Sequence, residues 1–458
     1  MRFGVFLIAA SVLAAAGCRE GDGPSDPGAT DVRLHVVSDP AGASIELDDQ
    51  ATGRFTPDTL DLRSGEHSLH LRLDSAGYTY DYAAIFRIAR SDSVATLYAP
   101  LALQCPVDLP AACYAASRRS HTAAGMRFTT TPRGALFHWD GSGQGIFWPA
   151  AGINSYMASA LPTFAASIGG QKVAIGPYDH AFFAGRPAPR VEQAGGLFRA
   201  THTSWIVPPF AAGRRFSTVR GIELVQEVIA RDDVAQVFLV RLTFRNITDL
   251  PDLYDYAPYL SLAPVTYTDA YIGMILDPDI GESSDDWLSY DPDLDMVYAY
   301  DARFAEPAFV GDASAAPGLV GLRALRVPAG TAVQMNGWTN RQGLAGDWNG
   351  GTDGEAVGYG VLSGQASYLP EHANPRIGHL PTASGDARIT LTAGPLTLPP
   401  GQQAEIVLAI AIAAPMPGSF TFEQAVQPGD PAVTSRQLHA IAALLRDRMR
   451  AAEALLGN

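Results

Sequence analysis

Acidic side chains concentrate in one stretch of this chain, residues 277–301, DPDIGESSDDWLSYDPDLDMVYAYD, which holds nine carboxylates and no basic residue. Within it an Asp-Pro-Asp triplet occurs twice, at Asp277–Asp279 and at Asp291–Asp293. In extended backbone, residues i and i+2 point to the same face, so each triplet places two carboxylates side by side. Like charges in that arrangement repel each other unless water or a counter-ion screens them. The spacing therefore predicts a site for a hard divalent cation.

Calcium is the cation that this stretch would suit, because it takes about six to eight oxygen ligands from carboxylates, carbonyls and water. The EF-hand pattern is only half met. Counted from Asp277, Gly281 stands at the fifth position, and Leu288 stands at the twelfth, where the pattern requires Glu. We therefore expect an irregular calcium site built from a subset of the local aspartates, Asp277, Asp279, Asp285, Asp286, Asp291, Asp293 and Asp295.

Two other interpretations of the acidic stretch stay open. It could be a solvated hairpin whose aromatic residues, Trp287, Tyr290, Tyr298 and Tyr300, pack inward. It could also supply a glycosidase-like pair of carboxylates, one acid and one base or nucleophile, with Trp205, Trp338 or Trp348 as a platform for the sugar. The sequence does not fix the separation of any two carboxylates, so it does not decide between these alternatives.

A glycine-rich segment, residues 336–360, is the second candidate site. We predict an exposed loop that either contacts a ligand or is merely structural, and the residues that would contact the ligand are Trp338, Asp347, Trp348 and Asp353. Other catalytic patterns are missing from the sequence, which has no GxSxG, no HExxH and no phosphate-binding loop. No catalytic residue is assigned.

Charge and composition exclude some classes of protein. The formal net charge is −15, and residues 246–302 contain thirteen Asp or Glu residues and no basic residue. A nucleic-acid-binding surface needs the opposite sign, so we exclude that class of partner. With 47% hydrophobic and 17% charged residues, the chain can bury a sizeable core.

The N-terminus predicts export. Arg2 precedes the apolar run FGVFLIAASVLAAAG, which ends at Cys18 and is too short for a membrane span but typical of a secretory signal. The AAGC ending resembles the lipobox of bacterial lipoproteins, with Ala15 where that family most often has Leu. The resemblance implies that residues 1–17 are a signal peptide, that Cys18 is lipidated and that residues 18–31 are a flexible tether. The alternative is ordinary cleavage, which would release a soluble protein.

Cys105 and Cys113 lie in a predicted linker, residues 100–120. An exported compartment is oxidising, so we expect them to form a disulfide that closes a short loop, and two buried free thiols are the alternative.

The unit 32–99 alternates apolar and polar residues between turn signals, with a turn at DPAG (39–42) and a predicted hairpin around Ser64–Gly65. It resembles the PEGA module, a small β-domain of surface proteins, through Pro40, Gly42, Thr52, Gly53, Thr56, Pro57, Gly65, Leu69, Leu71, Gly77 and Tyr78. His67 and His70, three residues apart in a strand, should point to opposite faces and not form a metal pair.

The β-branched residues and regularly spaced turns of residues 121–431 predict a large β-sandwich region, which is either one sandwich or two. Residues 234–248 show strand alternation, and 387–414 reads as three strands with turns at Ala393–Gly394 and Pro399–Gly401. Residues 432–458 predict a C-terminal helix, with Ser435 as a cap and an apolar stripe that packs on the sandwich or, alternatively, binds a partner.

The region 121–458 resembles an uncharacterised family of exported bacterial proteins, many of which end in a type IX secretion sorting domain. The acidic stretch and the segment GDARITLTAGPLTLPPGQQAEIVLAIAIA are among the landmarks. The resemblance implies a mostly β architecture, and the family offers no established activity to carry over to this chain. We therefore expect a lipid-anchored cell-envelope protein, at the outer membrane or facing the periplasm. It would be a non-enzymatic surface, binding or structural module with a glycan or envelope protein as ligand, and a carbohydrate-active enzyme on a β-sandwich is the alternative.

Overall fold

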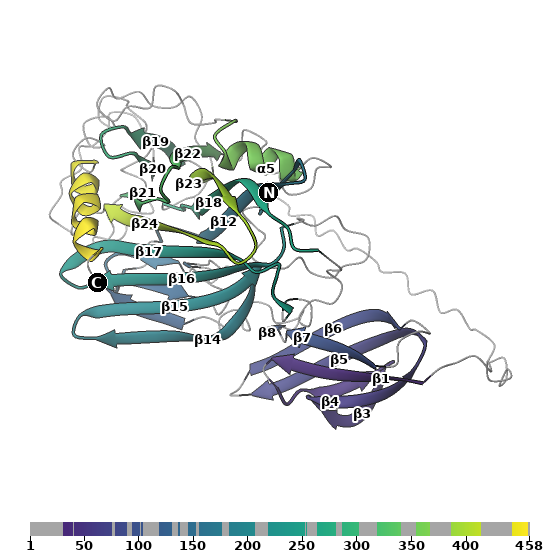
Figure 1. Ribbon diagram of the computed structural model, residues 1–458. Coiled ribbons are helices and arrows are strands. Elements are labelled where there is room, and N and C mark those ends of the chain that lie inside the picture. Colours follow the sequence, from purple (N-terminus) through teal and green to yellow (C-terminus); the bar gives the residue numbers. More distant parts are fainter. Residues whose placement is uncertain are drawn as a thin grey trace, which may run out of the picture.

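The computed structural model describes most of the chain from residue 31 onward. The described residues are 31–39, 41–75, 78–88, 94–100, 102–103, 119–130, 136–137, 145–152, 155–175, 183–206, 219–251, 253, 263–280, 286–301, 318–339, 354–366, 386–413 and 442–456. They form a small N-terminal β-domain and a larger β-domain, as predicted (Figure 1). Several predicted site residues lie outside these ranges, namely Cys18, Cys105, Cys113, Asp285, Asp347, Trp348 and Asp353.

The N-terminal domain is a small sandwich of two sheets. The first has the order β4-β1-β7, with β1 (Asp31–Asp39), β4 (Asp58–Arg63) and β7 (Val94–Pro100). The second has the order β3-β2-β5-β6-β8, with β2 (Ser44–Leu47), β3 (Gln50–Phe55), β5 (Gly65–Ser75), β6 (Tyr78–Ile88) and β8 (Ala102–Leu103). Alternate apolar residues of both sheets form one buried core, which includes Val32, Leu34, Val36, Ile45, Leu60, Leu62, Leu69, Leu71 and Leu97.

The hairpin predicted around Ser64–Gly65 is wrong. β4 pairs with β1, whereas β5 pairs with β2 and β6, so the chain crosses from one sheet to the other at this turn. Leu62 of β4 and Leu69 of β5 both belong to the buried core. A turn signal marks where the chain reverses, but burial decides whether the two strands share a sheet or face each other across the core.

The larger domain has one layer made of an eight-stranded antiparallel sheet. Its order is β14-β15-β16-β17-β24-β21-β20-β19. The strands are β14 (Phe183–Ala194), β15 (Leu197–Ile206), β16 (Ile222–Arg231), β17 (Val234–Asn246), β24 (Gln403–Ala413), β21 (Leu319–Arg326), β20 (Met296–Asp301) and β19 (Asp286–Asp291). β17 matches the alternation predicted for residues 234–248.

The facing layer combines a five-stranded and a three-stranded sheet. The first has the order β13-β12-β18-β23-β22, with β12 (Ser159–Ile168), β13 (Gln171–Ala174), β18 (Tyr267–Asp277), β22 (Ala332–Thr339) and β23 (Ala387–Leu398). The second has the order β11-β10-β9, with β9 (Arg119–Ala123), β10 (Met126–Thr130) and β11 (Ile146–Phe147). Isolated bridges from Leu136 to Thr130 and to Ala160 join the two sheets.

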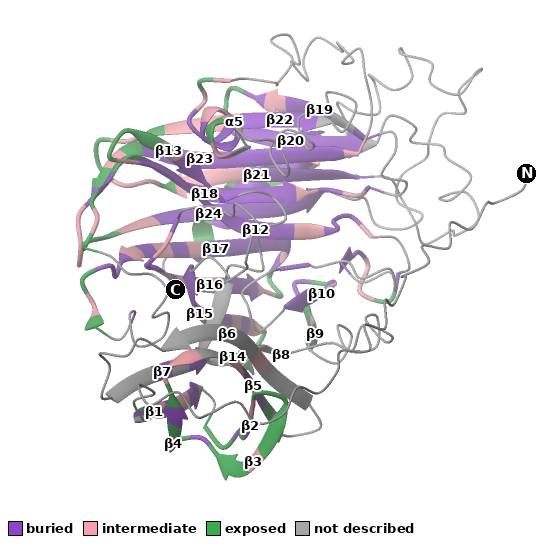
Figure 2. Ribbon diagram, turned by 90° about the vertical axis from the view of Figure 1, so that its right-hand side faces the viewer, coloured by how far each residue is buried: buried purple, intermediate pink, exposed green. Residues whose placement is uncertain are grey.

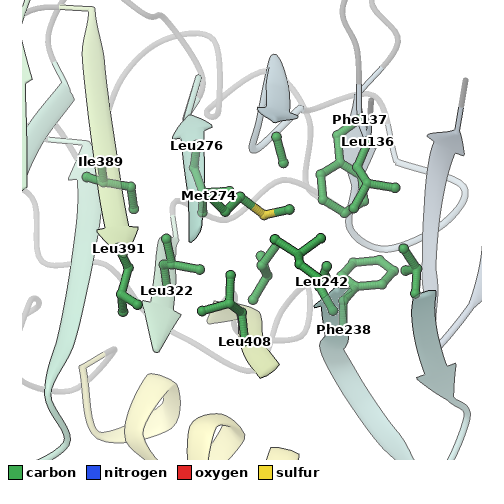
Figure 3. Close-up of a cluster of buried hydrophobic side chains, with 14 of the residues drawn as sticks. Leu136, Phe137, Phe238, Leu242, Met274, Leu276, Leu322, Ile389, Leu391 and Leu408 are labelled. Carbon is green, nitrogen blue, oxygen red and sulfur yellow. The ribbon is translucent and has the colours of Figure 1, made fainter. Parts of the chain in front are cut away.

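One continuous apolar core fills the space between the layers. Phe238, Leu242 and Leu408 come from the eight-stranded sheet, and Met274 and Leu391 come from the facing layer (Figure 3). A single buried cluster contains residues of both layers, so the described strands of the larger domain share one core.

Each outer face of the sandwich carries a helix. The C-terminal helix, described over 442–451 and continued by η3 (Ala452–Leu455), buries Leu445 and Met449 against the eight-stranded sheet, as its apolar stripe predicts. α5 (Gly354–Leu362) covers the five-stranded sheet with Tyr359 and Leu362. Among the described helices, none is long and apolar enough to cross a membrane.

Two local predictions for the larger domain are wrong. Residues 387–413 form two strands and not three, because Gly394 lies inside β23, where its missing side chain allows Tyr271 to approach the backbone. The predicted exposed loop 336–360 begins at the buried end of β22, residues 336–338, and ends in α5. Tertiary burial overrides the glycine content in both places.

His67 ties the start of β5 to the β2–β3 turn. Its Nδ1 lies 2.8 Å from Asp48 Oδ2 and its Nε2 lies 2.7 Å from the carbonyl oxygen of Arg63, so both ring nitrogens face acceptors. Burial opposes the charged ring, but these hydrogen bonds outweigh it and raise the pKa of His67 above its ordinary value. His70 lies on the other face beside Glu46, as the strand alternation predicts.

The protonated ring of His67 should stabilise the N-terminal domain in a pH-dependent way. Because the pKa is raised in the folded state, this contribution is complete below the unfolded-state pKa of about 6.5 and is lost as the pH rises through the folded-state pKa. We expect hydrogen-exchange protection of β5 to fall over that range in the wild type and to be flat in His67→Gln. His70→Gln, the matched control, should keep the wild-type slope, and an equal slope in all three proteins would contradict the assignment.

Candidate cation site

The first acidic triplet lies at one end of the five-stranded sheet. β18 ends at Asp277 and pairs antiparallel with the start of β23, where Leu276 is opposite Ile389. This register brings Asp277 beside Arg388, and Asp386 lies just before β23 begins. The fold therefore joins two segments that are more than 100 residues apart in the sequence.

Three carboxylates meet here. One oxygen from each of Asp277, Asp279 and Asp386 lies within 4.8 Å of the other two. Arg388 forms ion pairs with Asp277 and Asp386, and its Nη1 also donates to the carbonyl oxygen of Ala387 at 2.9 Å. The side chains of Arg388 and Asp277 are 9% and 14% exposed, whereas that of Asp386 is 31% exposed, so the cluster is partly shielded from water. One guanidinium against three carboxylates leaves a formal charge of −2 when all are ionised.

Burial makes that negative charge costly. It raises the pKa of Asp277 well above its ordinary value, against the opposing charge of Arg388. It also raises the pKa of Asp279 to about 6, with a further increase from the charge of Asp386. A second cation placed among the carboxylates would relieve this repulsion, and three carboxylate oxygens are ligands that Ca²⁺ accepts.

The second acidic triplet is neutralised by a different partner. Asp291 is 1% exposed and forms an ion pair with Arg446 of the C-terminal helix, which is also 4.0 Å from Asp293. Oδ1 of Asp291 accepts a hydrogen bond from the backbone N–H of Asp293 at 2.9 Å. Asp295 is exposed in the β19–β20 turn, with a φ of 47°. The stretch itself contains no basic residue, and the fold supplies one to this triplet from the far end of the chain.

Among the described residues, the aspartates that the sequence predicts as calcium ligands fall into separate groups. Asp277 and Asp279 come together, whereas Asp291, Asp293 and Asp295 belong to the β19–β20 hairpin, and Asp286 is buried with Oδ2 accepting from the N–H of Ile280 at 3.4 Å. Sequence reasoning missed Asp386. The sequence feature that could have identified Asp386 is the Asp-Ala-Arg tripeptide at 386–388, which places opposite charges at the start of a predicted strand.

The aromatic residues proposed as sugar platforms lie in the core where the structure describes them. Trp338 is 1% exposed and packs with Tyr271 and Tyr359 beneath α5. Trp205 is 6% exposed, and its Nε1 donates to Glu223 at 3.1 Å. Trp338 is therefore a packing residue and not part of an exposed ligand loop.

Comparison with known families places the N-terminal domain. Residues 32–85 match the PEGA domain. The matched range begins in β1 and ends within β6, so it covers most of the small sandwich and agrees with the resemblance in the sequence. The small sandwich is thus a PEGA-like domain. No curated protein sequence matches the chain.

Solved structures resemble the chain only distantly. A heparan sulfate lyase, HepC from Pedobacter heparinus, has a TM-score of 0.26 and 9% identity, covering 79% of this chain and 36% of its own. A putative kojibiose phosphorylase from human microbiome has a TM-score of 0.27 and 7% identity, with 73% and 34% covered. A copper-containing benzylamine oxidase from Hansenula polymorpha has a TM-score of 0.29 and 9% identity, with 84% and 77% covered. The chain spans about a third of the length of the first two, and no activity transfers from any of them at such TM-scores.

Removing Arg446 should destabilise the larger domain by leaving Asp291 buried without its counter-charge. Breaking a buried ion pair from one side costs about 3–5 kcal/mol, and we expect the lower end because Arg446 is 22% exposed. Arg446→Met should therefore lower the free energy of unfolding measured with urea, and the double variant with Asp291→Asn should recover part of the loss. If the loss of stability in the double variant equals the sum of the losses in the two single variants, the pair is not coupled.

Proposed function

We propose that this protein is a lipid-anchored component of the bacterial cell envelope and that its two β-domains act as a non-enzymatic surface or binding module. The PEGA match carries the proposal, because the sequence resemblance links that module to surface proteins. The lipobox-like AAGC before Arg19 supports attachment through Cys18. A glycan or another envelope protein is the proposed ligand.

We further propose that the larger domain binds calcium through Asp277, Asp279 and Asp386. The convergence of three carboxylates around one arginine, at a partly buried sheet end, supports this assignment. The carbohydrate-active alternative is disfavoured by the burial of Trp205 and Trp338, two of the residues that would serve as its platform for the sugar.

Calcium should stabilise the protein through this cluster. A ligand that binds only the folded state adds about 2.7 kcal/mol at a concentration of one hundred times its Kd, so the melting temperature should rise with added Ca²⁺ and fall with a chelator. Asp279→Asn should abolish the response, while Asp295→Asn, in the exposed turn, should keep it. A melting curve that neither treatment moves would argue for a cluster that is simply solvated.

Lipidation should determine where the protein is found. In a bacterial host that processes lipoproteins, the wild type is expected in the membrane fraction with the added mass of acyl chains on Cys18, since several chains give stable anchoring. Cys18→Ser should lose that mass and leave the membrane fraction after carbonate washing. The same mass and fractionation for both proteins would contradict the anchor and leave the calcium proposal unaffected.

A further inference from the structure

One large apolar side chain stands out in solvent. Phe55 is 61% exposed and is the large hydrophobic residue that the described part of the chain leaves exposed. It ends β3, the outermost strand of the five-stranded sheet of the PEGA-like domain. Figure 2 shows β3 at the edge of this domain with its residues exposed along most of the strand.

The backbone next to Phe55 is firmly held. Thr56 is 4% exposed, and its N–H donates to the carbonyl oxygen of Ala43 at 2.8 Å while its own carbonyl accepts from the N–H of Gly42 at 2.8 Å. Oγ1 of Thr56 accepts from the N–H of Ala43 at 2.9 Å. A buried hydrogen-bond network therefore fixes the backbone next to the ring. This network involves Thr56 and does not require an aromatic residue at position 55.

Polar and charged residues of the two neighbouring strands lie on the same face of the sheet as Phe55. Phe55 is opposite Ser44, which is opposite Arg72, so the three residues form one row across β3, β2 and β5. In the neighbouring row Glu46 is opposite His70. Arg72, Glu46 and His70 have exposed side-chain fractions of 57%, 44% and 42%. At a strand spacing of about 4.8 Å, the row is about 10 Å long.

This composition favours one kind of ligand. Contiguous apolar patches larger than roughly a few hundred Å² mark protein interaction sites, and a single ring among charged residues does not form such a patch. A membrane surface would favour clustered basic residues, whereas Glu46 and Asp74 here balance His70 and Arg72. An exposed ring beside hydroxyl, carboxylate and guanidinium groups suits a sugar, whose C–H face packs on the ring while its hydroxyls bond to the polar groups.

We propose that Phe55, with Ser44, Arg72, Glu46 and His70, forms a binding site for a pyranose unit of an envelope glycan. The inference deepens the proposed function, on which it rests for the presence of glycan at the cell envelope. It is independent of the carboxylate cluster, which lies in the other domain.

The test uses the purified protein with two probes, a soluble β-linked N-acetylglucosamine oligosaccharide followed by calorimetry and insoluble peptidoglycan followed by co-sedimentation. Loss of ring stacking in Phe55→Ala should weaken binding by about tenfold or more. Phe55→Trp should bind at least as tightly as the wild type, which a merely structural role would not produce. Arg33→Ala, exposed on the opposite sheet, should bind normally. All three variants should melt like the wild type, because neither side chain is in the core.

Three results would overturn the site. The protein could fail to bind both probes, Phe55→Ala could bind as tightly as the wild type, or Phe55 could prove to mediate self-association. The last would appear in sedimentation velocity without glycan, as a dimer in the wild type that is lost in Phe55→Ala. Membrane fractionation of Phe55→Ala distinguishes this site from the proposed envelope location. If the variant stays in the membrane fraction, its glycan binding, whether lost or unaltered, bears only on the site at Phe55.

Discussion

The strands at the centre of the larger sandwich are buried on both faces, and this constraint determines most of the rest of the domain. The first eight residues of β23 and the last eight of β24 are all buried. The space between the layers covers only one face of each strand, so the outer face needs a second cover. α5 and the C-terminal helix provide it, with Tyr359 and Leu362 on one side and Leu445 and Met449 on the other.

The same covers control the electrostatics of the acidic stretch. Once helices and loops pack over the sheet, charges at the strand ends are removed from water, and each must find a partner within the fold. Arg446 belongs to the covering helix and neutralises Asp291, while Arg388 belongs to a central strand and pairs with Asp277. The stretch lacks basic residues in sequence because its counter-charges come from segments that are neighbours only in space. The first cluster still carries two uncompensated carboxylates, which distinguishes it from the second.

The sequence predicts those features of the fold that depend on local periodicity. The alternation in 234–248 and the apolar stripe of the C-terminal helix each identify an element and its buried face. Strand pairing depends on distant residues, so the turn at Ser64–Gly65 and the strand interruption at Gly394 were misread. α5 contains three glycines and has low intrinsic helix propensity, so its stability comes from burial and not from its own sequence. Two of the three carboxylates of the candidate cation site could be predicted, because Asp277 and Asp279 are only two residues apart, but Asp386 joins them only through the β18–β23 register.

Both candidate sites lie where core packing makes the fewest demands on the sequence. Inward positions along the strands must be apolar and closely packed, so substitutions there cost stability before they can change binding. Asp277 and Asp279 are at the end of β18, and Phe55 is at the end of an outermost strand. Because these positions belong to separate cores, a change in one should leave the stability of the other domain unaltered. The two-domain arrangement thus allows the two proposed sites to vary independently of each other.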